Sequence, residues 1–179
     1  MLEISNLSKT FNKNTINEKI ALDHINLTLK EGDFVTVIGG NGAGKSTLLN
    51  AICGAWNIDA GKILLDGINI TNMADYKRAK FLGRVFQDPM MGTAGEMEIA
   101  ENLAIANRRG KRRTLRWGMK KQEKATYQTL LAQLDLGLEN RLTSKVGLLS
   151  GGQRQALTLL MATLQKPKLL LLDEHTAAL

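Results

Sequence analysis

The chain has 179 residues, a hydrophobic content of 44% and a formal net charge of +7. This length is sufficient for one domain that buries most of its apolar surface. No apolar run reaches the roughly 18 to 20 residues that cross a bilayer, and the start, MLEISNLSKTFN, lacks a basic and then apolar secretion signal. A single cysteine excludes a disulfide framework, so we expect a cytosolic protein.

The N-terminal part of the chain, residues 2 to 38, is predicted to form strands and turns. Its last piece, FVTVI (34 to 38), is typical of a buried parallel strand that enters a glycine cluster. After GGNGAGKST, the stretch LLNAIC predicts a helix closed by Gly54. KILLDGINI (62 to 70) then predicts a strand, an Asp-Gly turn and a second strand.

Beyond GRVFQDP (83 to 89) the apolar periodicity becomes helical, and residues 96 to 136 are expected to be mainly helix. A second apolar stripe with helical spacing follows, which we interpret as plain core. This helix should end before Pro167 and lead into the strand KLLLLD. The residues that carry the two patterns are Tyr127, Leu130, Leu131 and Leu134 in the first, and Leu157, Leu160, Met161 and Leu164 in the second.

The positive charge is concentrated in one segment, NRRGKRRTLRWGMKK (107 to 121), which holds eight Lys or Arg and no acid. The rest of the chain is nearly neutral, with 16 basic and 17 acidic residues. Such a run is compatible with nucleic acid or with an anionic membrane face. A solvated surface explains it equally well.

The glycine cluster contains the first motif that indicates a chemical function. Gly39, Gly44, Lys45 and Ser46 match G-x-x-x-x-G-K-[ST], between a predicted strand and a predicted helix. Glycines let backbone amides converge on phosphate oxygens, the helix N-terminus adds a favourable dipole, and Lys45 brings positive charge toward the β and γ phosphates. The hydroxyl of Ser46 is suited to Mg²⁺.

Two adjacent carboxylates follow the last apolar run. A buried strand that ends in Asp beside a phosphate loop can hold the Mg²⁺ shell, so Asp173 is the candidate metal partner of Ser46. Glu174 is the candidate that orients or deprotonates the attacking water. An acidic pair also occurs at simple turns, and only the upstream loop makes the pair specific.

A second anion site is indicated by LSGGQ (149 to 153). Ser150 and Gln153 form the S-x-x-Q pattern of a capping box at the start of a helix. The glycines between them, Gly151 and Gly152, leave backbone amides accessible at that helix N-terminus.

Taken in order, GGNGAGKS, FQDP, LSGGQ and LLLLDE resemble the nucleotide-binding domain of ABC-type ATPases, over essentially the whole chain. The resemblance implies an α/β fold with a P-loop NTPase core of mainly parallel sheet and flanking helices, an N-terminal antiparallel β-subdomain and a helical subdomain insert. The implied division is 1–87 for the β-subdomain and P-loop core, 88–149 for the helical subdomain, and 150–179 for the return to a core that is incomplete at its C-terminal end.

The resemblance also implies the site. Gln87 would sense Mg²⁺ and the transmembrane partner, and Phe11 would stack on adenine, with a core role for Phe11 as the alternative. Mg²⁺ would be held by Ser46, Gln87 and Asp173, and catalysis would rest on Glu174, Lys45 and Gln87. The residues that would bind ATP are Phe11, Gly39, Asn41, Gly42, Ala43, Gly44, Lys45, Ser46 and Thr47, together with Ser150, Gly151, Gly152 and Gln153.

What the resemblance implies about function is an ATP-hydrolysing subunit that energises solute transport as a head-to-tail homodimer at the cytoplasmic face of the cell membrane. Its partners would be transmembrane permease subunits and an extracytoplasmic solute-binding protein, with no nucleic acid. DEHTAAL and the basic segment resemble the branch of bacterial importers for amino acids and related solutes. Two alternatives stay open: a soluble ABC-type ATPase on ribosomes or nucleic acid, and a nucleotide-binding fragment without turnover, because the family's D-loop aspartate and switch histidine lie beyond Leu179.

Overall fold

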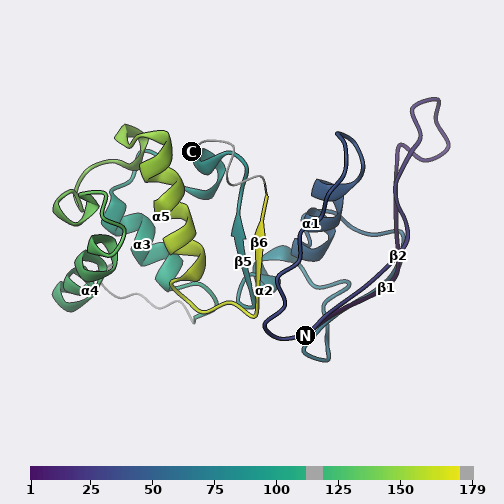
Figure 1. The fold of residues 1–179 in the computed structure, drawn as a ribbon, viewed down its shortest axis with the longest axis horizontal. Coiled ribbons are helices and arrows are strands. Elements are labelled where there is room, and N and C mark those ends of the chain that lie inside the picture. Colours follow the sequence, from purple (N-terminus) through teal and green to yellow (C-terminus); the bar gives the residue numbers. More distant parts are fainter. Residues whose placement is uncertain (112–118, 174–179) are drawn as a thin grey trace. The chain divides into compact units, whose positions relative to one another are not determined.

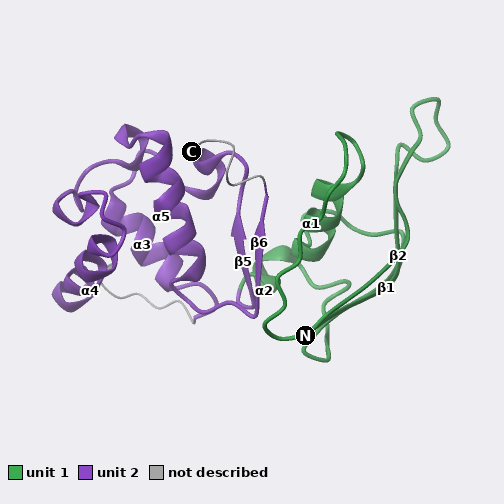
Figure 2. Ribbon diagram, in the orientation of Figure 1, with its two compact units in different colours: residues 1–79 green, residues 80–179 purple. Residues whose placement is uncertain are grey.

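The computed structural model describes residues 1–111 and 119–173 (Figure 1). The chain divides into two compact units, Met1–Ala79 and Lys80–Leu179 (Figure 2). The boundaries expected from the sequence, at 87/88 and 149/150, stay predictions.

Unit 1 is built on an antiparallel sheet. Its strands are β1 (Leu2–Phe11), β2 (Lys19–Leu29), β3 (Ala60–Leu65) and β4 (Ile68–Asn69), in the order β2-β1-β3-β4. The turn between β3 and β4 has Asp66 at φ 49° and Gly67 at φ 74°. Positive φ at both central residues matches the right-handed twist of the flanking strands. The predicted hairpin and the antiparallel N-terminal subdomain are therefore confirmed.

The two helices of unit 1 are α1 (Lys45–Cys53) and the short α2 (Asp75–Arg78). α1 buries one face, made of Thr47, Leu48, Ala51 and Ile52. It ends at Gly54, whose φ of 81° is the left-handed conformation that glycine adopts without cost from a side chain. The predicted helix and its glycine stop are both confirmed.

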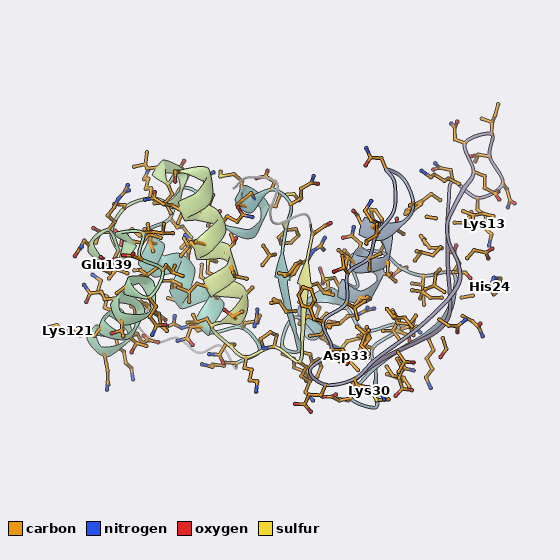
Figure 3. The ribbon with its side chains drawn as sticks, in the orientation of Figure 1. Lys13, His24, Lys30, Asp33, Lys121 and Glu139 are labelled. Carbon is orange, nitrogen blue, oxygen red and sulfur yellow. The ribbon has the colours of Figure 1, made fainter. Side chains whose placement is uncertain are left out.

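The strand predicted over residues 34 to 38 is wrong for this structure. After β2 the chain turns at Lys30, whose N–H donates to the Asp33 carboxylate at 2.8 Å (Figure 3), and then runs to the loop without regular structure. Phe34 is 88% exposed and Ile38 is 90% exposed. The apolar and β-branched residues favour a strand, but a strand exists only where a neighbouring backbone supplies its hydrogen bonds. Among the described residues, no strand pairs with this segment.

Unit 2 combines a two-stranded parallel sheet with a group of helices. The strands β5 (Leu82–Val85) and β6 (Leu169–Leu172) pair in register, with Leu82 opposite Leu169. Because the strands are parallel, the intervening chain has to cross over, and it does so through helices. These are η1 (Pro89–Gly92), α3 (Ile99–Asn107), α4 (Lys121–Ala132), η2 (Leu138–Asn140), η3 (Val146–Leu148) and α5 (Gly151–Thr163).

The core of unit 2 lies between α3, α4 and α5, which are grouped together in Figure 1. Fully buried side chains from each helix meet there, among them Leu103, Tyr127, Leu131 and Leu157. The helical periodicity of Tyr127 and Leu131 and the helix that ends before Pro167 are confirmed. Part of the basic segment 107–121 lies outside the described residues. No described helix has both the length and the apolar character that a membrane span requires.

Candidate nucleotide site

The glycine-rich loop of unit 1 leads directly into α1. Gly44, the residue before the helix, has φ 89°. A β-carbon at Gly44 would lie 2.3 Å from the carbonyl oxygen of Ala21 on β2, which is far inside van der Waals contact. Both the backbone angle and the space therefore require glycine at this position. The close approach fixes the start of α1 against β2.

The N-terminus of α1 carries partial positive charge, and no described side chain of the helix end offsets it. Within the described residues, no side chain caps this end and no acid occupies its first turn. Its first amide groups therefore retain their hydrogen-bonding capacity, and the helix dipole adds partial positive charge. Lys45 folds its ammonium into the loop and donates to the carbonyls of Gly39 (2.7 Å) and Gly40 (3.1 Å). Ser46 is exposed and Thr47 is buried.

The predicted aromatic residue of the site, Phe11, ends β1. Its half-buried ring packs edge to face with Trp56, at a centroid distance of 4.9 Å and an interplanar angle of 81°. The Lys9 ammonium lies 5.4 Å from the ring centroid. Asp59 holds this part of β1, because it accepts a hydrogen bond from the Thr10 N–H at 2.6 Å and pairs with Lys9 at 3.4 Å. The ring is thus neither free nor fully incorporated in the core.

Arg78 of α2 fixes the other end of α1. Its guanidinium, only 4% exposed, donates to the carbonyls of Ala51 (2.8 Å) and Ile52 (2.9 Å) in the last turn of the helix. It also donates to the carbonyls of Met73 (2.6 Å) and Thr71 (2.8 Å). Burial lowers the pKa of this guanidinium from its ordinary value, with Cys53 and Asp75 opposing the shift. Nothing in the sequence pattern singled out Arg78.

In unit 2, Asp173 follows the end of β6, as predicted. Its N–H donates to the carbonyl of Val85 at 3.2 Å, so it continues the β5–β6 pairing by one residue. Its carboxylate lies 4.0 Å from the guanidinium of Arg84, and about five sixths of each side chain is buried. Gln87 is exposed, beyond the end of β5. Glu174 lies outside the described residues.

The signature LSGGQ has the local structure predicted for it. The Ser150 hydroxyl accepts from the Gln153 N–H at 3.3 Å, and the Gln153 side chain accepts from the Ser150 N–H at 3.2 Å. The capping box at the start of α5 is therefore confirmed. Gly151 and Gly152 differ from Gly44, because neither has a positive φ. A β-carbon on either would meet nothing within 4 Å in the described part of the chain. The fold of this chain gives no reason for two glycines here.

The structure thus places both the loop residues Gly39 to Thr47 and Phe11 in unit 1. It places Gln87, Asp173 and Ser150 to Gln153 in unit 2. A glycine loop with positive φ at Gly42 and Gly44, a helix N-terminus without a capping side chain and a loop lysine define unit 1 as a phosphate-binding module of the P-loop class. The particular family follows from comparison with known proteins.

The family model described as "ABC transporter" matches residues 22–177, so the chain belongs to the ABC transporter family. The tyrosine transport ATP-binding protein of Clostridioides difficile (strain R20291) is 47% identical over 184 residues, which cover the whole chain and 71% of that protein. The spermidine/putrescine import ATP-binding protein PotA of Haemophilus influenzae (strain ATCC 51907) is 35% identical, and the chain covers 44% of its length.

Solved structures agree with this assignment. The dimeric ATP-binding cassette MJ0796, in a post-hydrolysis state with ADP and Pi, superposes with a TM-score of 0.83 at 28% identity and covers the whole chain. The ADP form of the cassette MJ1267 has a TM-score of 0.77 at 30% identity. The chain covers 76% and 70% of these two structures. It is an ATP-binding and ATP-hydrolysing cassette of an ABC transporter, and its predicted α/β fold class is confirmed.

Proposed function

We propose that the loop from Gly39 to Thr47 holds the phosphates of ATP. The observation that carries this proposal is the N-terminus of α1, where glycine is enforced at Gly44 and amide groups without a capping side chain lie next to the Lys45 ammonium. Phosphate oxygens would accept hydrogen bonds from these amides and from Lys45 in place of the loop carbonyls. Along the loop, Asn41, Gly42, Ala43 and Ser46 are exposed and accessible to such a ligand.

For the base, Phe11 is the proposed stacking partner. Its ring is edge-on to Trp56, so the pair offers an aromatic surface at the end of β1. Stacking of a base on an aromatic side chain is worth about 1 to 3 kcal/mol in nucleic-acid-binding proteins. The half-buried position of Phe11 supports this role over a purely core role.

The proposed metal is Mg²⁺, held by Ser46, Gln87 and Asp173. A hydroxyl, an amide oxygen and a carboxylate are hard oxygen donors, which is the set that Mg²⁺ prefers alongside water and phosphate oxygens. The Asp173 carboxylate lies 4.0 Å from the Arg84 guanidinium, which holds it at the end of β6. When bound, the ion would neutralise charge that develops on the phosphates. Glu174 is the proposed residue that orients or deprotonates the attacking water, and Lys45 and Gln87 complete the catalytic set.

A head-to-tail homodimer is the proposed working form, with Ser150, Gly151, Gly152 and Gln153 of one copy closing over the phosphates bound to the other. Gly151 and Gly152 support this proposal, because neither backbone strain nor crowding within the described chain explains them. Close approach of a phosphate to the helix N-terminus does explain them, since any side chain would stand between the ligand and the amides. The dimeric MJ0796 cassettes show that proteins of this fold pair.

We further propose that the protein works at the cytoplasmic face of the membrane, with transmembrane permease subunits and an extracytoplasmic solute-binding protein. The amino-acid class is the proposed cargo, because the tyrosine transport protein of Clostridioides difficile shares 47% of its residues over the whole chain. The basic segment 107–121 is proposed to face anionic lipid or the permease loops, although residues 112–118 lie outside the described structure. The helical part proposed to face the permease is 88–149.

The dimer is tested with Gly151→Asp in the Glu174→Gln background. The new carboxylate has open space around it, so each copy should fold and bind Mg-ATP, but it would repel the phosphates of the opposing copy. Sedimentation with Mg-ATP should show a dimer for Glu174→Gln alone and a monomer for the double variant. Gln128→Asp is the matched control, because it adds the same charge to an exposed position on α4 and should keep the dimer. Equal dimerisation of all three proteins would refute the proposal.

A further inference from the structure

Lys19 lies next to the phosphate loop although it is distant from it in the sequence. It begins β2, and in the β1–β2 ladder it is directly opposite Phe11. Its ammonium nitrogen lies 3.1 Å from the position that a β-carbon on Gly42 would occupy. One residue therefore borders both the proposed adenine platform and the middle of the glycine loop, within a single compact unit.

Within the part of the chain that the structure describes, the charge of Lys19 has no counter-ion nearby. Among the described residues, no carboxylate lies within ion-pair distance of it. The neighbouring carboxylate, Glu18, is turned into the β1–β2 turn, where it accepts from the Asn14 N–H at 2.6 Å. Lys9, the other cation near Phe11, is already paired with Asp59. Of these two cations near the ring, Lys9 thus has an acidic partner, and Lys19 has none within residues 1–111 and 119–173.

The loop itself adds to this excess of positive charge. Lys45 holds its ammonium against the loop carbonyls, and the amide groups at the start of α1 carry the partial positive charge of the helix dipole. A second ammonium beside these groups is electrostatically unfavourable unless an anion shares the site. Polyphosphate is an anion of sufficient charge to do so.

From this arrangement we propose that Lys19 is a second phosphate-binding cation, which contacts the polyphosphate of the nucleotide at Gly42 and raises affinity for ATP and ADP over AMP. This inference rests on the proposed function of the loop. Lys19 is a binding residue in this account and takes no part in bond breaking.

The test is calorimetric titration of ATP, ADP and AMP into wild type and Lys19→Ala, at low and at physiological salt. We expect Lys19→Ala to weaken ATP and ADP about fivefold and AMP less than twofold, since a partly exposed ion pair contributes modestly. The salt dependence of ATP binding should also become shallower. Lys19→Arg, which keeps the charge, should stay within about twofold of wild type.

Lys30→Ala is the matched control. Lys30 follows the opposite end of the same strand (Figure 3), roughly 35 Å away along β2 at the usual rise per residue, and its loss should leave all three affinities unchanged. Unchanged ATP affinity in Lys19→Ala, or equal weakening of ATP and AMP, would overturn the inference.

Failure of the loop proposal would look different. In that case wild type would bind no ATP, or Lys45→Ala would bind ATP as wild type does, whatever Lys19→Ala shows. Fluorescence of Trp56, followed in a Trp117→Phe background, provides a second readout, because the ring contacts Phe11 and should respond to any ligand seated there.

Discussion

Replacing Arg78 with Met should loosen the helix that presents the phosphate loop. The guanidinium donates four hydrogen bonds to backbone carbonyls from a site that is 4% exposed, and two of these carbonyls end α1. Methionine retains the apolar volume of the stem but supplies no donor, so the four carbonyls lose their partner.

The expected loss is about 3 kcal/mol. A net contribution of about 1 kcal/mol for each of four hydrogen bonds gives about 4 kcal/mol, and relief from burying the charge returns part of it. Burial lowers the pKa of Arg78, which is the sign of that desolvation cost. Every 1.4 kcal/mol is a factor of ten in an equilibrium constant. Amide hydrogens of α1 should therefore exchange more than 100-fold faster in Arg78→Met, if exchange follows the opening equilibrium.

The measurement is native-state hydrogen exchange of the α1 amides. ATP affinity is a second readout, which should fall because a loosened α1 holds the phosphate loop less firmly. Lys77→Met is the control, since it removes a cation from an exposed position on the same short helix. Exchange in Arg78→Met within about threefold of wild type would refute the reasoning, because it would show that water or a neighbouring group satisfies the carbonyls.

Three further variants test other parts of the structure. The hydrogen bond from the Thr10 N–H lowers the pKa of Asp59 below its ordinary value of 3.8; burial opposes this shift, and the Lys9 ammonium adds to it. The ionised form of Asp59 therefore stabilises the fold above pH 3.8, and this gain disappears as pH falls through the lowered pKa. Thermal melts between pH 2 and 6 should therefore show a larger acid loss for wild type than for Asp59→Asn, by at most about 1 kcal/mol since the group is exposed. Gly44→Ala should abolish ATP binding in calorimetry and destabilise unit 1 by about 3 kcal/mol, from the clash and the positive φ. Asn102→Ala should cost unit 2 about 2 to 3 kcal/mol in urea unfolding, because the 2% exposed amide bonds backbone groups ahead of α3.

The elements that the sequence predicted well are those governed by local chemistry. Gly54 ends α1, the Asp-Gly turn joins β3 and β4, and Ser150 with Gln153 caps α5, all through interactions between residues a few positions apart. Glycine conformation, turn chemistry and capping are set within such short stretches. This is why the candidate loop and signature could be identified from the sequence alone.

Features that depend on residues far apart in the chain could not be predicted from the sequence. Residues 34 to 38 have strand composition, but strand formation is decided by a partner backbone, and composition carries no information about one. The four carbonyls that surround Arg78 come from two separate segments. The position of Lys19 beside Gly42 arises from the β1–β2 ladder and from the close approach of Gly44 to Ala21. No sequence motif marks either of these features.

The most direct test of the central claim is steady-state Mg-ATP turnover measured over a range of protein concentrations, with Lys45→Ala and Glu174→Gln as controls. The account predicts a turnover per chain that rises with concentration, because two copies form each site, and that is lost in both variants. Turnover that is independent of concentration, or that persists without Lys45 and Glu174, would contradict it.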